Sequence, residues 1–156
     1  QRERMSDNAL SCVLQVRSRS GRVALLAGDI EAKQEAALVQ REAEALRADL
    51  LSVPHHGSRT SSTAVFLDAV QPRLSVVQVG RRNRYGHPAP DVLARYQASD
   101  LPVLSTPDCG AVMWRSLDLP KGAQRTVTDL CWRLRKPRYW QAATGNEPNS
   151  MPGGEL

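Results

Sequence analysis

Long apolar segments are missing from this sequence of 156 residues. The longest apolar runs, such as residues 23–27 and 75–79, have the length of a β-strand and are far too short to cross a bilayer. The sequence also has no initiator methionine and no signal-peptide pattern. We therefore expect a soluble segment that belongs to a longer protein.

Cysteine is scarce as well, with three residues at positions 12, 109 and 131. They form no CxxC motif or other close pair, and an odd number argues against a disulfide framework. We expect buried or incidental thiols that carry no information about the compartment.

Positive charge is concentrated near the carboxyl end. The whole chain carries a formal charge of +5, and residues 115–138 account for all of it. This segment also contains Trp132, and Tyr139 and Trp140 follow. Two interpretations stay open, namely a surface for a polyanion or anionic membrane, and a solvated extension with a few aromatic anchors.

Strands and helices alternate along the first three quarters of the chain, after an opening hairpin. The patterns predict strands over residues 11–16, 22–29, 49–54, 73–80, 101–106 and 111–117, and helices over 30–48, 66–70 and 90–99. This alternation predicts an α/β layered domain with a mixed sheet. We expect the domain to cover residues 1–117, a basic aromatic extension 118–141, and a disordered tail 142–156.

The first strand end with unusual chemistry is Gly28-Asp29. A carboxylate after an apolar strand, preceded by a glycine that permits close backbone approach, is well placed to hold a metal ion. Asp29 also directly precedes a predicted helix, and aspartate is a favoured N-cap residue. Both interpretations stay open on the sequence.

The second strand end carries His55-His56-Gly57-Ser58. Imidazole is the commonest ligand of first-row transition metals, and paired histidines can supply one ligand and one group for proton transfer or phosphate contact. Gly57 lacks a side chain, which would let a substrate or metal approach. The alternative is two surface histidines in a turn.

The third strand end is the loop "RRNRYGHP", which holds His87. It combines an imidazole with an amide, a phenol and guanidinium groups, a set suited to phosphate recognition and proton transfer. All three histidines of the chain therefore lie just past predicted strand ends. In such sheets the polar site gathers at the strand ends, so we expect the three segments to form one site.

These motifs resemble a known family. In order, "NALSCVL", "VALLAGDIE", "LLSVPHHGSRTSS", "VVQVGRRNRYGHP" and "STPDCGAVMW" are similar to the C-terminal half of the metallo-β-lactamase-like domain of ComEC competence proteins. The similarity covers roughly residues 7–117. It implies a partial αββα sandwich with a metal site at the sheet edge.

The resemblance implies a function as well. ComEC proteins are integral proteins of the cell membrane that act in natural transformation, and their channel passes one DNA strand inward. The metallo-β-lactamase-like domain is thought to be a metal-dependent nuclease that hydrolyses the other strand. The implied cofactor is a divalent metal, Mn or Zn, with two ions in the complete domain and no small-molecule cofactor.

The functional roles known in the family are assigned only to residues of this chain that match the family's motifs. The implied metal ligands are Asp29, His55 and His56, and His55 is alternatively a phosphate contact. The implied catalytic residues are His87 and His55, with His87 as proton donor or stabiliser of the leaving oxygen. The implied contacts to the backbone of DNA, expected to be single-stranded, are Ser58, Arg59, Arg81, Arg82, Asn83, Arg84 and Tyr85.

The chain departs from the family in one respect. The HxHxDH motif of the family's N-terminal half does not occur in this sequence. We therefore expect the missing half and the membrane channel to be partners in the same protein, and this segment alone to be inactive with an exposed sheet face or edge. Two alternatives are another phosphoester or ester hydrolase of this fold, and a non-catalytic nucleic-acid-binding module with a vestigial metal site.

Overall fold

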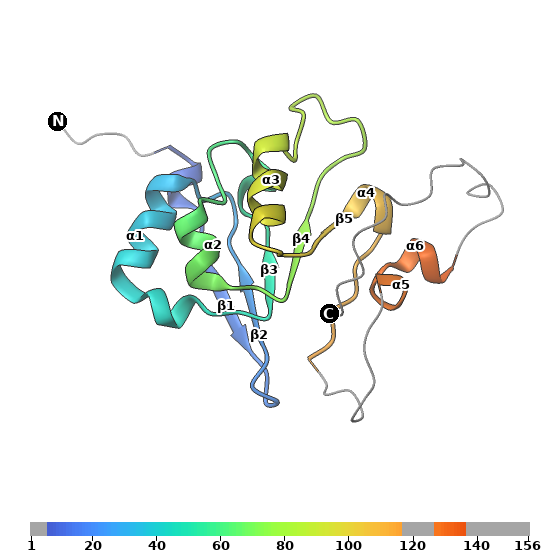
Figure 1. Ribbon diagram of the computed structural model, residues 1–156, viewed down its shortest axis with the longest axis horizontal. Coiled ribbons are helices and arrows are strands. Elements are labelled where there is room, and N and C mark those ends of the chain that lie inside the picture. Colours follow the sequence, from blue (N-terminus) through green and yellow to red (C-terminus); the bar gives the residue numbers. More distant parts are fainter. Residues whose placement is uncertain (1–5, 117–126, 137–156) are drawn as a thin grey trace.

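The computed structural model describes residues 6–116 and 127–136, without the side chains of residues 127 and 128 (Figure 1). Most of the expected basic extension over 118–141 and all of the expected tail over 142–156 lie outside these residues. Within them, no helix combines the length and the hydropathy that a membrane crossing requires.

A five-stranded mixed sheet forms the centre of the fold, and its strands follow their order in the chain. The first two strands pair antiparallel, and the remaining neighbours pair parallel. The strands are β1 (Leu14–Arg17), β2 (Val23–Leu26), β3 (Leu50–Ser52), β4 (Leu74–Val77) and β5 (Val103–Ser105). The predicted α/β class with a mixed sheet is confirmed.

Three helices connect the parallel strands: α1 (Ala32–Glu42), α2 (Ala64–Val70) and α3 (Pro90–Ala98). A short 3₁₀ turn over residues 43–46 replaces the end of the predicted first helix. Because the strand order never reverses and such crossovers are right-handed, all three helices cover the same face of the sheet. The main core lies between this face and the helices.

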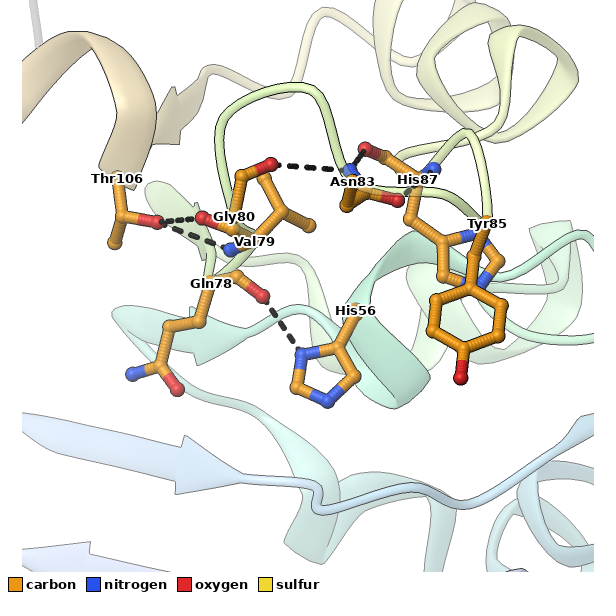
Figure 2. Close-up of a pocket in the computed structure, with 8 residues that line it drawn as sticks. All are labelled: His56, Gln78, Val79, Gly80, Asn83, Tyr85, His87 and Thr106. Carbon is orange, nitrogen blue, oxygen red and sulfur yellow. Dashed lines mark hydrogen bonds between the residues drawn. The ribbon is translucent and has the colours of Figure 1, made fainter.

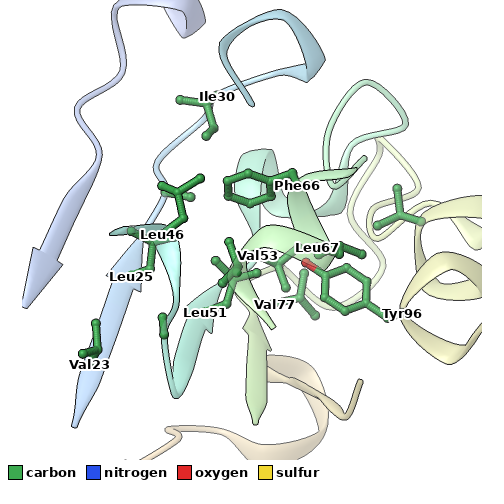
Figure 3. Close-up of a cluster of buried hydrophobic side chains, with 14 of the residues drawn as sticks. Val23, Leu25, Ile30, Leu46, Leu51, Val53, Phe66, Leu67, Val77 and Tyr96 are labelled. Carbon is green, nitrogen blue, oxygen red and sulfur yellow. The ribbon is translucent and has the colours of Figure 1, made fainter. Parts of the chain in front are cut away.

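Figure 3 shows that core, in which alternate strand residues point toward the helices. Leu25 and Leu51 are paired neighbours in the sheet and are at most 1% exposed. They lie in one cluster with Phe66 from α2 and Tyr96 from α3. Full burial of one such side chain contributes about 1.5–3 kcal/mol, so this layer holds the strand ends in place.

The opposite face of the sheet is covered only in part. The short helices α4 (Thr106–Cys109), α5 (Val127–Leu130) and α6 (Trp132–Arg135) lie near the carboxyl end, and Cys109 and Leu130 form a second cluster with Leu74 and Leu104. Over β1 and β2 the same face leaves Leu14 at 55%, Val16 at 49% and Leu26 at 41% exposed. Of the expected exposed sheet face or edge, an apolar face over β1 and β2 is therefore present.

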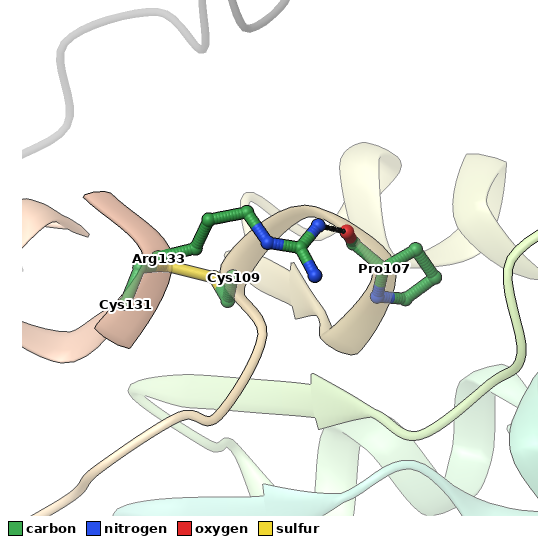
Figure 4. The surroundings of a disulfide bond; sticks show 4 residues. All are labelled: Pro107, Cys109, Cys131 and Arg133. Carbon is green, nitrogen blue, oxygen red and sulfur yellow. Dashed lines mark hydrogen bonds between the residues drawn. A yellow bond between two sulfur atoms is a disulfide. The ribbon is translucent and has the colours of Figure 1, made fainter. Parts of the chain in front are cut away.

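The cysteine prediction is wrong for two of the three residues. Cys109 and Cys131 form a disulfide bond with their Cα atoms 4.4 Å apart, and Arg133 donates a hydrogen bond to the Pro107 carbonyl beside it (Figure 4). Cys12 is free and exposed. The pairing joins positions 22 residues apart, which sequence spacing alone does not reveal.

The strand predicted over residues 111–117 is also wrong for the described part of that range. Val112 instead makes a single antiparallel bridge to Cys131, and the short helix α4 lies between β5 and this bridge. The backbone groups of Ala111 and Met113 hydrogen-bond to Trp132 and Leu130 rather than to the sheet.

Candidate metal and phosphate site

The carboxyl ends of the parallel strands meet at one edge of the sheet. Asp29 follows β2, His55 and His56 follow β3, and His87 follows β4. The ring centroids of His55 and His87 are 6.2 Å apart, and the His56 Nε2 lies 3.6 Å from the Asp29 Oδ1. The prediction that the three strand ends gather is therefore confirmed.

The two adjacent histidines adopt an unusual backbone conformation. His55 has φ 47° and His56 has φ 55°, so both lie in the left-handed region. The main-chain N–H of His55 donates to the Gly28 carbonyl at 2.9 Å, which fixes the turn against the end of β2. The left-handed conformation costs a residue with a side chain roughly 1–2 kcal/mol. Such strain gathers at functional sites, where the surrounding structure enforces it.

We expect His56→Gly to be more stable than His56→Ala by about 1 kcal/mol. Both variants lose the imidazole, but only glycine adopts the left-handed conformation without steric cost. The measurement is the free energy of unfolding in denaturant. Ala36→Gly, on the exposed face of α1, is the control and should destabilise by about 1 kcal/mol. Equal stability of the two His56 variants would mean that the backbone at this position is not strained.

The His56 ring has a defined orientation (Figure 2). Its Nδ1 lies 2.7 Å from the Gln78 main-chain carbonyl, which only accepts hydrogen bonds, so Nδ1 carries the proton. In the neutral ring, the lone pair of Nε2 then lies beside the Asp29 carboxylate. Histidines that bind metals are commonly oriented by this kind of hydrogen bond. Two ligands at about 2.1 Å from a tetrahedral ion are about 3.4 Å apart, close to the 3.6 Å found here.

Asp29 does not cap the helix. The N-cap of α1 is Glu31, which forms a capping box with Gln34. The main-chain N–H of Asp29 donates to the Ser11 hydroxyl at 3.2 Å. Gly28 has φ +59°, and a Cβ there would lie 3.1 Å from the Cys12 carbonyl oxygen, so the glycine permits a close approach of backbone to backbone. The capping interpretation is therefore wrong, and the Asp29 carboxylate remains at the site.

Glu31 is a site residue that sequence reasoning missed. Its Oε1 lies 3.3 Å from the His55 Nδ1 and accepts a hydrogen bond from the Thr60 hydroxyl at 2.9 Å. The His55 Nδ1 is buried and makes no hydrogen bond of good geometry within the described part of the chain. The only sequence signal was its position two residues after Asp29.

Gly57 has a different function from the one predicted. The space that its missing side chain leaves is filled by Pro88, since a Cβ at position 57 would lie 2.7 Å from the Pro88 Cβ. The Gly57 carbonyl also accepts a hydrogen bond from the Ala89 N–H at 2.8 Å. The glycine therefore locks the two histidine segments together rather than admitting a substrate or metal.

Two predicted phosphate contacts are engaged within the protein. The Asn83 amide donates to the Gly80 and His87 carbonyls and accepts from the His87 N–H, so it holds its own loop together. Ser58 is 8% exposed, and its hydroxyl lies 3.2 Å from that of Thr60. The hydrogen bonds give both residues a structural role.

The predicted arginine contacts remain at the surface. Arg59, Arg81, Arg82 and Arg84 are exposed. Arg59 lies 3.6 Å from the Asp91 carboxylate, and the Arg84 guanidinium lies 4.8 Å from the centre of the Tyr85 ring. A flexible surface pair such as Arg59 with Asp91 adds little stability, so the guanidinium groups can turn toward a phosphate.

His87 is stacked on Tyr85, with ring centroids 5.8 Å apart and an interplanar angle of 17°. Burial, followed by the nearby charges of His55 and His56, lowers the pKa of His87 from its ordinary value of 6.5. A neutral ring can hydrogen-bond to an oxygen. Of its two predicted roles, stabilising a leaving oxygen agrees with this pKa direction better than proton donation.

The side chains that could bind a metal ion lie in two separate pairs. Asp29 lies with His56, and Glu31 lies with His55. Within residues 6–116 and 127–136, no three His, Cys, Asp or Glu side chains converge as a group that could hold an ion. The carboxylate and imidazole pair of Asp29 and His56 fits part of a Mn or Zn coordination sphere. The predicted three-residue metal set stays a prediction.

Three proteins with names that refer to competence or recombination are similar to this chain. The chain is 39% identical over 142 residues, 90% of its length, to Competence protein ComA of Neisseria gonorrhoeae. The chain is homologous to a segment of competence proteins. It is also 35% identical over 91 residues, 58% of its length, to ComE operon protein 3 of Bacillus subtilis (strain 168). Over 107 residues, 69% of its length, it is 35% identical to Recombination protein 2 of Haemophilus influenzae.

The chain corresponds to a small part of each of these relatives. The matched residues make up 19% of the gonococcal protein, 12% of the Bacillus protein and 13% of the Haemophilus protein. No protein-family model matches the chain.

Proposed function

We propose that this chain contributes part of the active site of a metal-dependent nuclease that acts in DNA uptake during natural transformation. The substrate would be the phosphodiester backbone of the DNA strand that is not transported. The names of the competence-protein relatives support the process, and the site supports the chemistry.

The observation that carries the proposal is the pair of Asp29 and His56. The His56 ring is oriented by the Gln78 carbonyl so that its second nitrogen, Nε2, lies 3.6 Å from the Asp29 carboxylate. Asp29 and His56 would hold a Mn or Zn ion, with His55 nearby. A divalent ion supplies an activated water and neutralises charge on the phosphate oxygens. The strained conformation of both histidines supports a functional turn.

The chain's own residues would bind and orient the strand. The exposed arginines around the site would contact backbone phosphates without reading bases, namely Arg59, Arg81, Arg82 and Arg84. His87 would donate a hydrogen bond to the leaving oxygen. Asn83 would act indirectly, because its amide holds the His87 loop in place.

We also propose that the domain belongs to a larger metallo-β-lactamase-like sandwich in a membrane protein. The apolar face exposed at Leu14, Val16 and Leu26 supports a further layer packed against β1 and β2. The complete domain would hold two ions, and this chain alone would lack nuclease activity.

The test combines metal binding with cleavage. In NMR spectra of the chain, added Mn²⁺ should broaden the His56 ring signals, and Asp29→Asn should reduce this broadening. In the full-length protein, Asp29→Asn or His56→Gln should lower cleavage of single-stranded DNA by at least about 100-fold while DNA binding is kept.

Asp68→Asn is the control, because Asp68 is an exposed carboxylate in α2, away from the histidines. It should alter neither metal binding nor cleavage. If the Asp29 and His56 variants cleave DNA as well as the parent protein, the nuclease proposal fails. DNA binding without cleavage in every variant would favour a non-catalytic binding module.

A further inference from the structure

A pocket of about 460 Å³ adjoins the candidate site, between the ends of β3, β4 and β5 (Figure 2). His56 lines it after β3, Thr106 after β5, and Tyr85 and His87 in the loop after β4. The volume lies within the roughly 300 to 1,000 Å³ of small-molecule sites. His56 lines the pocket and also faces Asp29. If a ligand places a phosphate at His56, the part of the ligand attached to that phosphate would therefore lie in the pocket.

One side of the pocket is an exposed aromatic ring. Tyr85 is 66% exposed, and stacking on His87 at 5.8 Å fixes the orientation of its ring. The guanidinium of Arg84 lies 4.8 Å from the Tyr85 ring centre. Nucleobases stack on aromatic side chains and on guanidinium planes, so this side has the chemistry of a base-stacking platform.

Another part of the lining offers an amide without a partner. The Gln78 side chain makes no hydrogen bond within the described part of the chain, whereas the Asn83 amide is fully engaged in its loop. The Thr106 hydroxyl is also engaged, with the Val79 backbone. Gln78 therefore presents both a donor and an acceptor, which match the edge of an unpaired base.

We propose that this pocket binds one unpaired nucleobase of the DNA strand whose backbone phosphate lies at His56. The inference rests on the proposed action on DNA and extends it to the substrate class. A base in a duplex would have to leave its stack to reach the pocket, so single-stranded DNA is the favoured substrate. The exposed Arg81 and Arg82, on the same loop as Tyr85, add contacts to the backbone.

The test measures binding of the full 156-residue chain to short fluorescent oligonucleotides in the presence of EDTA, so that cleavage has no part in it. The probes are a single strand, a strand of equal length made of abasic sites, and a duplex. The single strand should bind about tenfold more tightly than the abasic strand. Tyr85→Ala should remove this difference, because it should weaken binding of the single strand far more than binding of the abasic strand.

Two further variants sharpen the test. Gln78→Ala should change the preference among homopolymeric strands by roughly fivefold to tenfold, because only a base edge would contact that amide. Val65→Ala is the control, since Val65 is an apolar residue of α2, 63% exposed and outside the pocket lining. It should leave all affinities unchanged.

Two results would overturn the inference. One is equal affinity of the parent chain for normal and abasic strands, and the other is an equal effect of Tyr85→Ala on both probes. Either result would still be compatible with binding of the DNA backbone and with the proposed nuclease activity. Conversely, base-dependent binding that is lost in Tyr85→Ala supports the pocket even when the full-length protein fails to cleave DNA.

Discussion

Gly57→Ala should destabilise the protein by roughly 3 kcal/mol. Two effects add at this position. Gly57 has φ +75°, a conformation that costs alanine about 1–2 kcal/mol, and the new Cβ would lie 2.7 Å from the Pro88 Cβ and 3.1 Å from its Cα. The contact cannot relax cheaply, because the Ala89 N–H ties the same two segments together through the Gly57 carbonyl.

Denaturant unfolding of Gly57→Ala measures this effect, and Gly21→Ala separates its two parts. Gly21 has φ +82°, but a Cβ at this position would meet no other atom within 4 Å, so its replacement carries the conformational cost alone. We expect Gly21→Ala to lose about 1 kcal/mol. If the two variants lose the same free energy of unfolding, the contact between position 57 and Pro88 is not tight.

Glu35→Ala should have an effect of similar size, about 3 kcal/mol. The Glu35 side chain is fully buried under the loop that follows the histidines. Its two oxygens accept hydrogen bonds from the main-chain N–H groups of Ser62 at 2.6 Å and Thr63 at 2.8 Å. Arg95 donates to the Ser61 and Ser62 carbonyls of the same loop. Alanine would leave two N–H groups without acceptors and a cavity beside them.

The pH dependence of stability reports on the same carboxyl. Burial raises the pKa of Glu35 above its ordinary 4.5, although hydrogen bonds from Thr63 and Ser62 and the charge of Arg95 oppose this shift. The folded state therefore binds the proton more tightly than the unfolded state. The contribution of this tighter proton binding to the free energy of unfolding is fully present below pH 4.5. It is lost as the pH rises through the raised pKa of Glu35.

Unfolding free energies of the parent chain and of Glu35→Gln, measured across this pH range, test the sign. The parent should lose stability relative to Glu35→Gln as the pH rises, because glutamine does not titrate. Glu42→Ala, at the exposed end of α1, should change stability by less than about 0.5 kcal/mol. A parent chain that gains stability relative to Glu35→Gln with rising pH would contradict the raised pKa.

Local patterns predicted much of this fold and site. Strand and helix periodicity, together with the position of each polar motif after a strand, placed Asp29, His56 and His87 at one edge. These are properties of short segments, and parallel connections bring the strand ends together without further information.

The contacts that the sequence did not reveal join distant positions. Glu31 contacts His55, Pro88 fills the space at Gly57, and Cys109 bonds Cys131. Each depends on how separate elements pack, and neither residue type nor spacing signals the partner. The internal contacts of Gly57 and Asn83 were missed for the same reason, since both residues bond to neighbouring loop segments.

The disulfide described above makes the chain between Cys109 and Cys131 a covalent ring. A protease that cuts one peptide bond inside this ring would leave both products joined, and electrophoresis without reductant would show a single species. Adding reductant would release two fragments. Digestion patterns of this protein therefore depend on the redox state of the sample as much as on where the chain is accessible.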